Sequence, residues 1–178
     1  FGGLSKNYRS AGFRGGWLIL SGAKQQAKSY IEGILFLASA RLCPNVPTQF
    51  GIQTALGGYQ SINDLVQPSG RLYKQLDLIY TRLTAIKGVN CIRPKGALYL
   101  FPSIDLSQFD IKDDNEFVFD LLNEHKVLVV AGNGFNYPKN NYFRIVILPS
   151  LDELNVALDR IEAFLDSRRK VTTEVLLP

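Results

Sequence analysis

Hydrophobic residues recur at steps of three and four residues in three long stretches of the chain, over residues 24–43, 69–87 and 151–169. This spacing places the apolar side chains on one face of a helix, so each stretch predicts an amphipathic helix with one buried stripe. The three stripes contain Ala27, Tyr30, Ile31, Ile34, Leu35, Ala38 and Leu42; then Leu72, Leu76, Ile79, Leu83 and Ile86; and finally Leu154, Leu158, Ile161 and Leu165.

Local signals predict where these helices begin and end. Pro44 ends the first helix, because the residue before a proline disfavours the helical region. Thr48 is a candidate cap for a short helix that runs to Leu56, and the Gly57–Gly58 pair stops it. Gly88 is expected just past the end of the second long helix, and Ser150 with Glu153 predicts a capping box for the third.

Short β-rich runs alternate with a further helix over 114–125. The runs occupy residues 15–21, 90–93, 97–101, 127–131 and 142–148. In the last run, two-residue alternation puts Phe143, Ile145 and Ile147 on one face of a strand and Arg144 on the opposite face. Together the runs predict an α/β fold whose sheet is mixed or antiparallel.

The pattern of predicted helices and strands changes along the chain and indicates two parts and a tail. Residues 1–70 resemble the end of a larger α/β domain. Residues 71–170 are expected to form a linking helix and a small α/β domain, and residues 171–178 break the preceding helical pattern as a tail. The chain opens on Phe-Gly-Gly and contains no methionine, which suggests a fragment of a longer protein.

Composition narrows the class of protein. The chain has 178 residues, 46% hydrophobic and 20% charged, which is ordinary for a globular protein. The net charge of +4 is spread along the chain without aromatic–basic interleaving, so no nucleic-acid partner is expected. The two cysteines and the single His125 lack metal-ligand spacing, so no metal site is expected. No run reaches membrane-spanning length, and a reduced, cytoplasmic setting is expected.

Two cations near the N-terminal end are the first candidates for chemistry. Lys6 and Arg14 lie eight residues apart in a glycine- and aromatic-rich frame. A lysine amine becomes a nucleophile when burial or a nearby cation lowers its pKa, and an arginine binds phosphate through two parallel hydrogen bonds. The plainer alternative is a solvated surface lysine in a loop, and composition alone favours it. For Arg144, pattern alone leaves open a solvent-facing arginine and a planar clamp for a carboxylate.

The frame around Lys6 carries a specific resemblance. The stretch Gly3-Leu4-Ser5-Lys6, followed after seven residues by Arg14-Gly15-Gly16-Trp17, resembles the pyridoxal-phosphate signature of class I/II aminotransferases of fold type I. The resemblance extends to about residue 170. It includes residues 94–99, the segment 127–135, and Tyr142-Phe143-Arg144-Ile145, while residues 41–47 and 53–60 look most like bacterial alanine aminotransferases.

The resemblance implies roles for four residues. Lys6 corresponds to the lysine that holds pyridoxal 5′-phosphate, Arg14 to the phosphate-binding arginine, and Arg144 to the arginine that binds the substrate carboxylate. Ser5 is a further candidate for the phosphate, because Gly3 stands where many members carry a serine. A second departure is Ala131, which stands where proline is usual. The groups for the pyridine nitrogen, the ring face and the phosphate loop would lie upstream of this chain.

The implied function is transamination between an alanine- or glutamate-type amino acid and a 2-oxo acid, by an enzyme that is a homodimer when complete. The chain alone is expected to be inactive or nearly so. The leading alternative is the effector-sensing, aminotransferase-like part of a transcriptional regulator, which binds the cofactor without turnover. A purely structural fragment is the third. The sequence does not specify which amino acid is used.

Weaker candidates have plainer interpretations. Arg41 could reach a partner subunit's site or simply satisfy helix-end carbonyls, and Tyr8 could line a site or pack in a core. His125 is expected to be structural at a helix end. Asp113–Asp114 is interpreted as a helix N-cap and not as a catalytic carboxylate pair.

Overall fold

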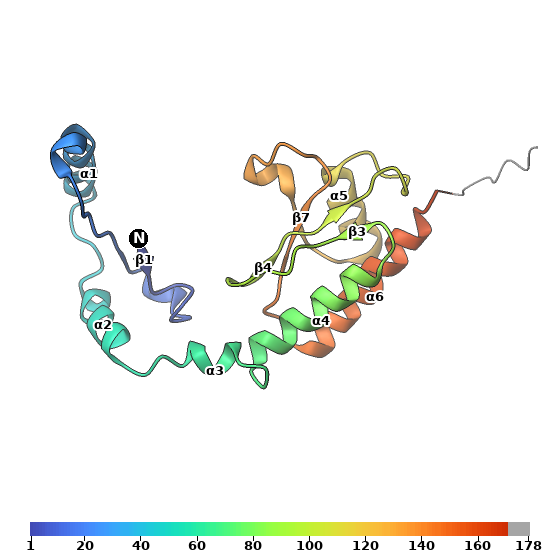
Figure 1. Ribbon diagram of the computed structural model, residues 1–178, viewed down its shortest axis with the longest axis horizontal. Coiled ribbons are helices and arrows are strands. Elements are labelled where there is room, and N and C mark those ends of the chain that lie inside the picture. Colours follow the sequence, from blue (N-terminus) through green and yellow to red (C-terminus); the bar gives the residue numbers. More distant parts are fainter. Residues whose placement is uncertain (171–178) are drawn as a thin grey trace, which may run out of the picture. The chain divides into compact units, whose positions relative to one another are not determined.

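The computed structural model describes residues 1–170, so the predicted tail at 171–178 lies outside the described residues. The chain forms two compact units, Phe1–Asp64 and the part from Leu65 onward (Figure 1). Among the described residues, no helix is both long enough and apolar enough to cross a bilayer.

The N-terminal unit is a small hairpin followed by helices. Strand β1 (Gly2–Gly3) pairs antiparallel with β2 (Gly16–Trp17), and the intervening loop contains the short 3-10 helix η1 (Ala11–Phe13). The remaining elements are η2 (Lys24–Ala27), α1 (Lys28–Arg41) and α2 (Val46–Gly57), and the short helix α3 (Ile62–Val66) crosses the boundary to the second unit.

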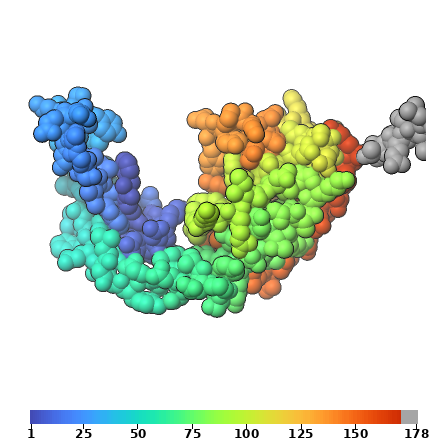
Figure 2. Space-filling model, in the orientation of Figure 1, coloured from blue at the N-terminus to red at the C-terminus, as the bar shows by residue number. Residues whose placement is uncertain are grey.

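Two predictions for this unit are wrong in detail. The buried strand expected over 15–21 is reduced to β2, and Ile19 is 76% exposed, because β2 pairs only with the two residues of β1. The first helix begins later than expected, and no residue of α1 is buried. Its apolar side chains at Leu35, Phe36 and Leu37 remain open to solvent. The atoms of the α1 region are blue in the space-filling view (Figure 2).

Helix α2 begins three residues earlier than predicted, and its cap is a different residue. Asn45 is the N-cap, and its side-chain oxygen accepts a hydrogen bond from the Thr48 amide at 3.4 Å. Pro47 is accommodated in the first turn, where its missing amide costs nothing. Thr48 is therefore inside the helix and is buried, at 4% exposure. The predicted stop is confirmed, because α2 ends at Gly57.

The C-terminal unit is an α/β domain with antiparallel strand pairing. Strand β7 lies between β4 and β6 in a three-stranded sheet, and β3 pairs with β5. The mixed or antiparallel sheet that the sequence predicts is thus antiparallel in every pairing described. The elements are α4 (Arg71–Ala85), β3 (Val89–Asn90), β4 (Tyr99–Leu100), β5 (Ser103–Ile104), α5 (Asp114–His125), β6 (Val130–Ala131), η3 (Gly132–Phe135), β7 (Phe143–Val146) and α6 (Leu151–Ser167).

The core of this unit is built on the inner face of β7. Phe143, Ile145 and Ile147 are buried, as the two-residue alternation predicts. The ring of Phe143 packs against Phe117 of α5 at 4.8 Å, and Phe117 in turn meets Phe164 of α6 at 5.7 Å. These contacts join the sheet to two helices. The predicted stripe of α6 is buried along its whole length.

Most helix ends in this unit follow the predicted caps. Helix α5 spans the predicted residues, and Asp113 caps it by accepting from two backbone amides at 3.0 Å. The capping box of Ser150 and Glu153 is present at the start of α6. Gly88 has φ of +90°, but it lies one residue further from the end of α4 than predicted, because Ile86 is the C-cap.

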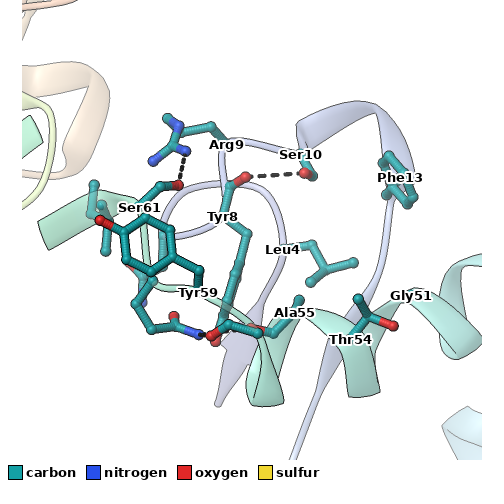
Figure 3. Close-up of a pocket in the computed structure, with 14 residues that line it drawn as sticks. Leu4, Tyr8, Arg9, Ser10, Phe13, Gly51, Thr54, Ala55, Tyr59 and Ser61 are labelled. Carbon is teal, nitrogen blue, oxygen red and sulfur yellow. Dashed lines mark hydrogen bonds between the residues drawn. The ribbon is translucent and has the colours of Figure 1, made fainter. Parts of the chain in front are cut away.

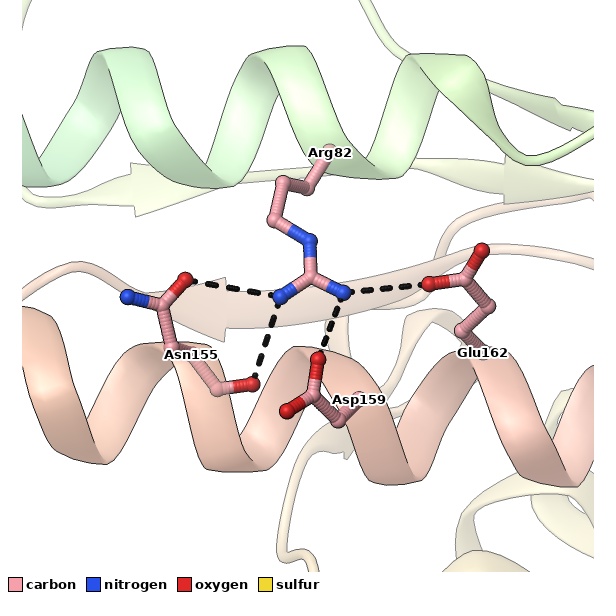
Figure 4. A network of polar contacts seen from close by, with 4 residues as sticks. All are labelled: Arg82, Asn155, Asp159 and Glu162. Carbon is pink, nitrogen blue, oxygen red and sulfur yellow. Dashed lines mark hydrogen bonds and ion pairs between the residues drawn. The ribbon is translucent and has the colours of Figure 1, made fainter.

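Helices α4 and α6 are joined by polar contacts as well as by apolar packing (Figure 1). At their N-terminal ends, the buried amide of Gln75 donates to the carbonyl of Pro149. One turn from the C-terminal end of α4, the Arg82 guanidinium contacts Asp159 at 2.7 Å and Glu162 at 3.0 Å (Figure 4). It also donates to the Asn155 side chain at 3.4 Å. One cation therefore holds three side chains of the facing helix.

Replacing Arg82 by Ala is expected to destabilise the C-terminal unit by about 1 kcal/mol, because the ion pairs are partly exposed and act as a network. Urea unfolding followed by circular dichroism measures the loss, and hydrogen exchange of the α4 amides localises it. The matched control is Lys112→Ala, an exposed lysine of the same unit. Equal stability of both variants would contradict a stabilising role for the network.

Replacing Gly88 by Ala is expected to cost about 1–3 kcal/mol, from a left-handed backbone and a steric clash. A Cβ atom there would lie 2.7 Å from the buried Phe109 ring. The control is Gly96→Ala, where a Cβ meets nothing within 4 Å and φ is not positive. Thermal unfolding of the two variants should separate them clearly, and matching midpoints would be inconsistent with this geometry.

Candidate functional site

The loop between β1 and β2 brings together three of the predicted site residues, Ser5, Lys6 and Arg14. The β-strand pairing continues one step into this loop, where the Leu4 amide donates to the Gly15 carbonyl at 3.0 Å. Leu4 is 2% exposed and anchors the loop. The two ends of the loop are therefore held together by this hydrogen bond at the end of the hairpin.

Lys6 is at the start of a tight turn inside this loop. Its carbonyl accepts from the Arg9 amide at 3.1 Å, and the Leu4 carbonyl accepts from the Ser10 amide at 3.0 Å. Arg9 takes the left-handed conformation, with φ of 53°, which allows the chain to reverse. The Lys6 side chain is exposed, while Ser5 is half-buried beside it. The turn thus presents a primary amine at the surface of the unit.

Arg14 follows the short helix η1 and also has a left-handed backbone, with φ of 53°. Its guanidinium is exposed, and Nη1 donates to the carbonyl of Ala11 at 2.8 Å. This bond uses one donor of the fork and leaves a planar cation at the surface of the same loop. The arrangement suits recognition of a phosphate or carboxylate.

Helix α2 holds the loop segment that carries Arg14. The buried hydroxyl of Thr48 donates to the Phe13 carbonyl at 2.6 Å, and the Asn45 amide group donates to the same oxygen at 3.3 Å. A Cβ atom at Gly15 would lie 2.2 Å from the Thr48 methyl group, so this glycine permits the close approach. Thr48 was predicted only as a helix cap, and no pattern in the sequence reveals this anchoring role.

A pocket of about 470 Å³ lies beside the loop, between residues 4–13 on one side and α2 with the segment that follows it on the other (Figure 3). Its rim is closed by a hydrogen bond from the Arg9 guanidinium to the Ser61 hydroxyl at 2.6 Å. Tyr59 also lines it, and the hydrogen bond of its hydroxyl to Asp64 raises the pKa of Tyr59. Neither Lys6 nor Arg14 lines this pocket, so it is separate from the predicted cofactor residues.

Arg144 belongs to the C-terminal unit, on the face of β7 opposite the core. Its guanidinium carbon lies 4.6 Å from the centre of the Tyr99 ring and 4.5 Å from the centre of the Phe135 ring. The Nε atom is buried and has no hydrogen-bond partner among the described residues. Arg144 is also absent from the ion pairs found within residues 1–170. It is therefore not a freely solvated surface arginine.

Tyr99 and Phe135 are the last residues of two segments that carry the family resemblance, 94–99 and 127–135, but sequence reasoning gave neither residue a role at the site. For Tyr99 a signal existed, because it precedes a buried residue in an alternating strand and so faces the same side as Arg144 once the register is known. For Phe135 the signal was its position at the end of the family-like segment 127–135, but its place in a 3-10 turn after β6 gives no alternation that points it toward Arg144.

The weaker candidates have structural surroundings. Tyr8 packs against Trp17, with ring centres 6.4 Å apart, and His125 packs edge-on against Phe164 at 5.6 Å. Arg41 donates to the Cys43 carbonyl at 3.3 Å. Asp114 is buried and accepts from the Asn133 amide at 2.9 Å, beside the N-cap residue Asp113.

Comparison with known proteins gives consistent results. A glutamate-pyruvate aminotransferase of Escherichia coli, AlaA, is 53% identical over 165 residues, which are 93% of this chain and 41% of that protein. An alanine aminotransferase of Mycobacterium tuberculosis is 53% identical over 170 residues, which are 96% of this chain and 40% of that protein. The chain thus spans about two-fifths of the length of these relatives.

Solved structures agree with the sequence matches. An aminotransferase from Escherichia coli superimposes with a TM-score of 0.89 at 51% identity, covering 95% of this chain and 42% of that one. An alanine aminotransferase from Pyrococcus furiosus superimposes with a TM-score of 0.83 at 37% identity, covering 93% of this chain and 41% of that one. The family model for aminotransferase class I and II matches residues 1–161. The predicted α/β fold and family are confirmed, and the chain belongs to the class I and II aminotransferases.

Proposed function

We propose that this chain is part of a pyridoxal-phosphate-dependent transaminase that moves an amino group between an alanine- or glutamate-type amino acid and a 2-oxo acid. The observation that carries the proposal is the single loop that presents Lys6 and Arg14 within one anchored hairpin. Membership of the aminotransferase family and the printed names of its relatives support the reaction class.

The residues of the loop fit the chemistry of the cofactor. An aldehyde that is to be held covalently needs a primary amine, and a phosphate needs a fixed cation or a set of hydrogen-bond donors. Lys6 and Arg14 provide the amine and the cation at the surface of one loop, and the half-buried Ser5 provides a hydroxyl next to Lys6. When bound, the cofactor supplies the electron sink that stabilises negative charge at the substrate Cα.

Each protein group then has one task. Lys6 would hold the cofactor through its Nζ atom, and its free amine would move a proton at the substrate Cα. Arg14 fixes the phosphate through its planar guanidinium, with Ser5 adding a hydrogen bond. The Thr48 hydroxyl, through its bond to the Phe13 carbonyl, keeps the backbone next to Arg14 in place.

Arg144 binds the carboxylate that amino acids and 2-oxo acids share. A guanidinium and a carboxylate match in plane and form two parallel hydrogen bonds. The burial of Nε and the absence of an acidic partner in the described ion pairs support this role, because a cation balanced only by aromatic rings is available to an incoming anion.

We also propose that the complete protein is a homodimer. The support from this chain is the apolar surface of α1, where Leu35, Phe36 and Leu37 are exposed by 60–74%. An apolar surface of this kind is usually covered in the functional state of a protein. Arg41, at the C-terminal end of α1, is then the residue that would reach the partner subunit's site.

Replacing Lys6 by Ala in the full-length protein is expected to abolish transamination and the covalent attachment of pyridoxal phosphate, because no other amine takes its place on the turn. Borohydride reduction followed by peptide mass spectrometry measures the attachment. Lys24→Ala, an exposed lysine of the same unit, serves as control. Covalent cofactor that persists in the Lys6 variant would refute the assignment. Cofactor attachment without turnover in the unmutated protein would favour the regulator alternative.

Replacing Arg144 by Ala is expected to raise the KM for the amino acid by about 100-fold or more, since a charged, bidentate pair is lost. Cofactor attachment at Lys6 should be unchanged. Steady-state kinetics measure the KM, and borohydride reduction followed by mass spectrometry measures the cofactor attachment. Arg160→Ala, on the exposed side of α6, is the control and should behave like the unmutated protein. An unaltered KM in the Arg144 variant would remove this residue from the site.

A further inference from the structure

We infer that Tyr99 and Phe135 form a two-ring clamp that positions the Arg144 guanidinium for the substrate carboxylate. The inference rests on the proposed carboxylate-binding role of Arg144 and adds two positioning residues to it. Tyr99 and Phe135 act through Arg144.

The geometry of the clamp is symmetrical. The guanidinium carbon is 4.6 Å from one ring centre and 4.5 Å from the other, and both distances are well within the range of cation–π attraction. A planar cation between two rings has its faces covered and its edge available for hydrogen bonds in the plane. A carboxylate binds along that edge. The rings therefore restrict the orientation of the guanidinium without using the donors that the substrate needs.

The sheet register places the first ring. Tyr99 of β4 is paired with Val146 of β7, and Val146 is two residues after Arg144 on the same face of the strand. Tyr99 and Arg144 are thus diagonal neighbours across an antiparallel pair, a separation that an aromatic side chain spans readily. On its other side, Arg144 is paired with Val130 of β6, and the η3 turn that carries Phe135 follows β6 directly in the chain.

The second ring is placed by a turn that is itself tied down. The buried carboxylate of Asp114 accepts from the Asn133 amide at 2.9 Å, and the Gly132 amide donates to the Tyr142 carbonyl at 2.8 Å. A Cβ atom at Gly132 would lie 2.8 Å from the Cβ atom of Tyr142, so the turn approaches β7 as closely as a glycine allows. Phe135, at the end of this turn, is consequently held over Arg144.

Further aromatic rings support Phe135 from behind. Phe101 meets Phe135 edge-on at 6.1 Å and stacks on Tyr142 at 5.2 Å. Tyr137 packs against Tyr142 at 4.7 Å, and the hydrogen bond between the two hydroxyl groups raises the pKa of Tyr137. The cluster restricts movement of the Phe135 ring, so the ring can hold the Arg144 guanidinium in one orientation.

A clamped arginine has already lost most of its side-chain freedom before the substrate arrives, so less is lost on binding. The carboxylate keeps its charge throughout the reaction, so Arg144 holds it equally in the ground state and the transition state. Removing a ring should therefore raise KM for substrates with a carboxylate and leave kcat nearly unchanged. A residue with a merely structural role would not show this split.

The test uses the full-length protein and two amine substrates, alanine and ethylamine, which is alanine without its carboxylate. Tyr99→Leu and Phe135→Leu are each expected to raise the KM for alanine by about threefold to tenfold, with ethylamine turnover unchanged. Tyr99→Phe and Phe135→Tyr keep the rings and should restore normal values. Phe119→Leu, an exposed aromatic of α5 that does not contact Arg144, is the matched control.

A second readout does not depend on activity. In the 178-residue chain, the Arg144 Nε–H resonance should be shifted upfield by the currents of the two rings, and each Leu variant should remove part of that shift. Arg144→Lys identifies the resonance by its disappearance.

The outcomes separate the clamp from the proposed function. If Arg144→Ala raises the KM for alanine but the two Leu variants do not, the clamp is overturned and the carboxylate role stands. An Arg144→Ala variant with a normal KM overturns both. Leu variants that impair alanine and ethylamine equally show general damage to the fold and also overturn the clamp.

Discussion

The alternation of side chains along β7 is the constraint on which the C-terminal unit depends. Phe143, Ile145 and Ile147 are buried against α5 and α6, and a strand with one buried face has only one register. The same register sends Arg144 to the other face, next to Tyr99. The hydrophobic core and the candidate substrate arginine are therefore set by one strand, because a shift of one residue would expose the core and bury the cation.

The N-terminal unit is held mainly by polar contacts and not by a hydrophobic core. Its loop is held by backbone hydrogen bonds and by the Thr48 and Asn45 side chains, which both donate to the Phe13 carbonyl. Leu4 and Thr48 are the only buried residues of this unit. Two left-handed residues, Arg9 and Arg14, turn the chain around Lys6. Polar contacts of this kind define a shape with little apolar burial, which suits a segment that presents an amine and a guanidinium to a ligand.

Helices with strong end signals were predicted well. The bounds of α5 are those expected from the sequence, and the capping box of α6 is present, because caps are local interactions of a few adjacent residues. Strands were predicted less well, since β1 and β5 were missed and each of the other five is shorter than expected. The pairing partner of a strand comes from elsewhere in the chain, so no local pattern contains it. For the same reason, α1 has the apolar spacing of a buried helix and yet no buried residue.

The sequence by itself determined the α/β class, the family signature around Lys6 and Arg14, and the face of β7 on which Arg144 lies. These features depend on residue types at short spacings, which a single chain displays directly. The tertiary structure alone decided that Thr48 anchors the loop beside Arg14 and that Tyr99 and Phe135 enclose Arg144. Each of these contacts joins residues that are well separated in the sequence: Phe13 and Thr48, Tyr99 and Arg144, and Phe135 and Arg144. Only the folded arrangement of turns and strands brings them together.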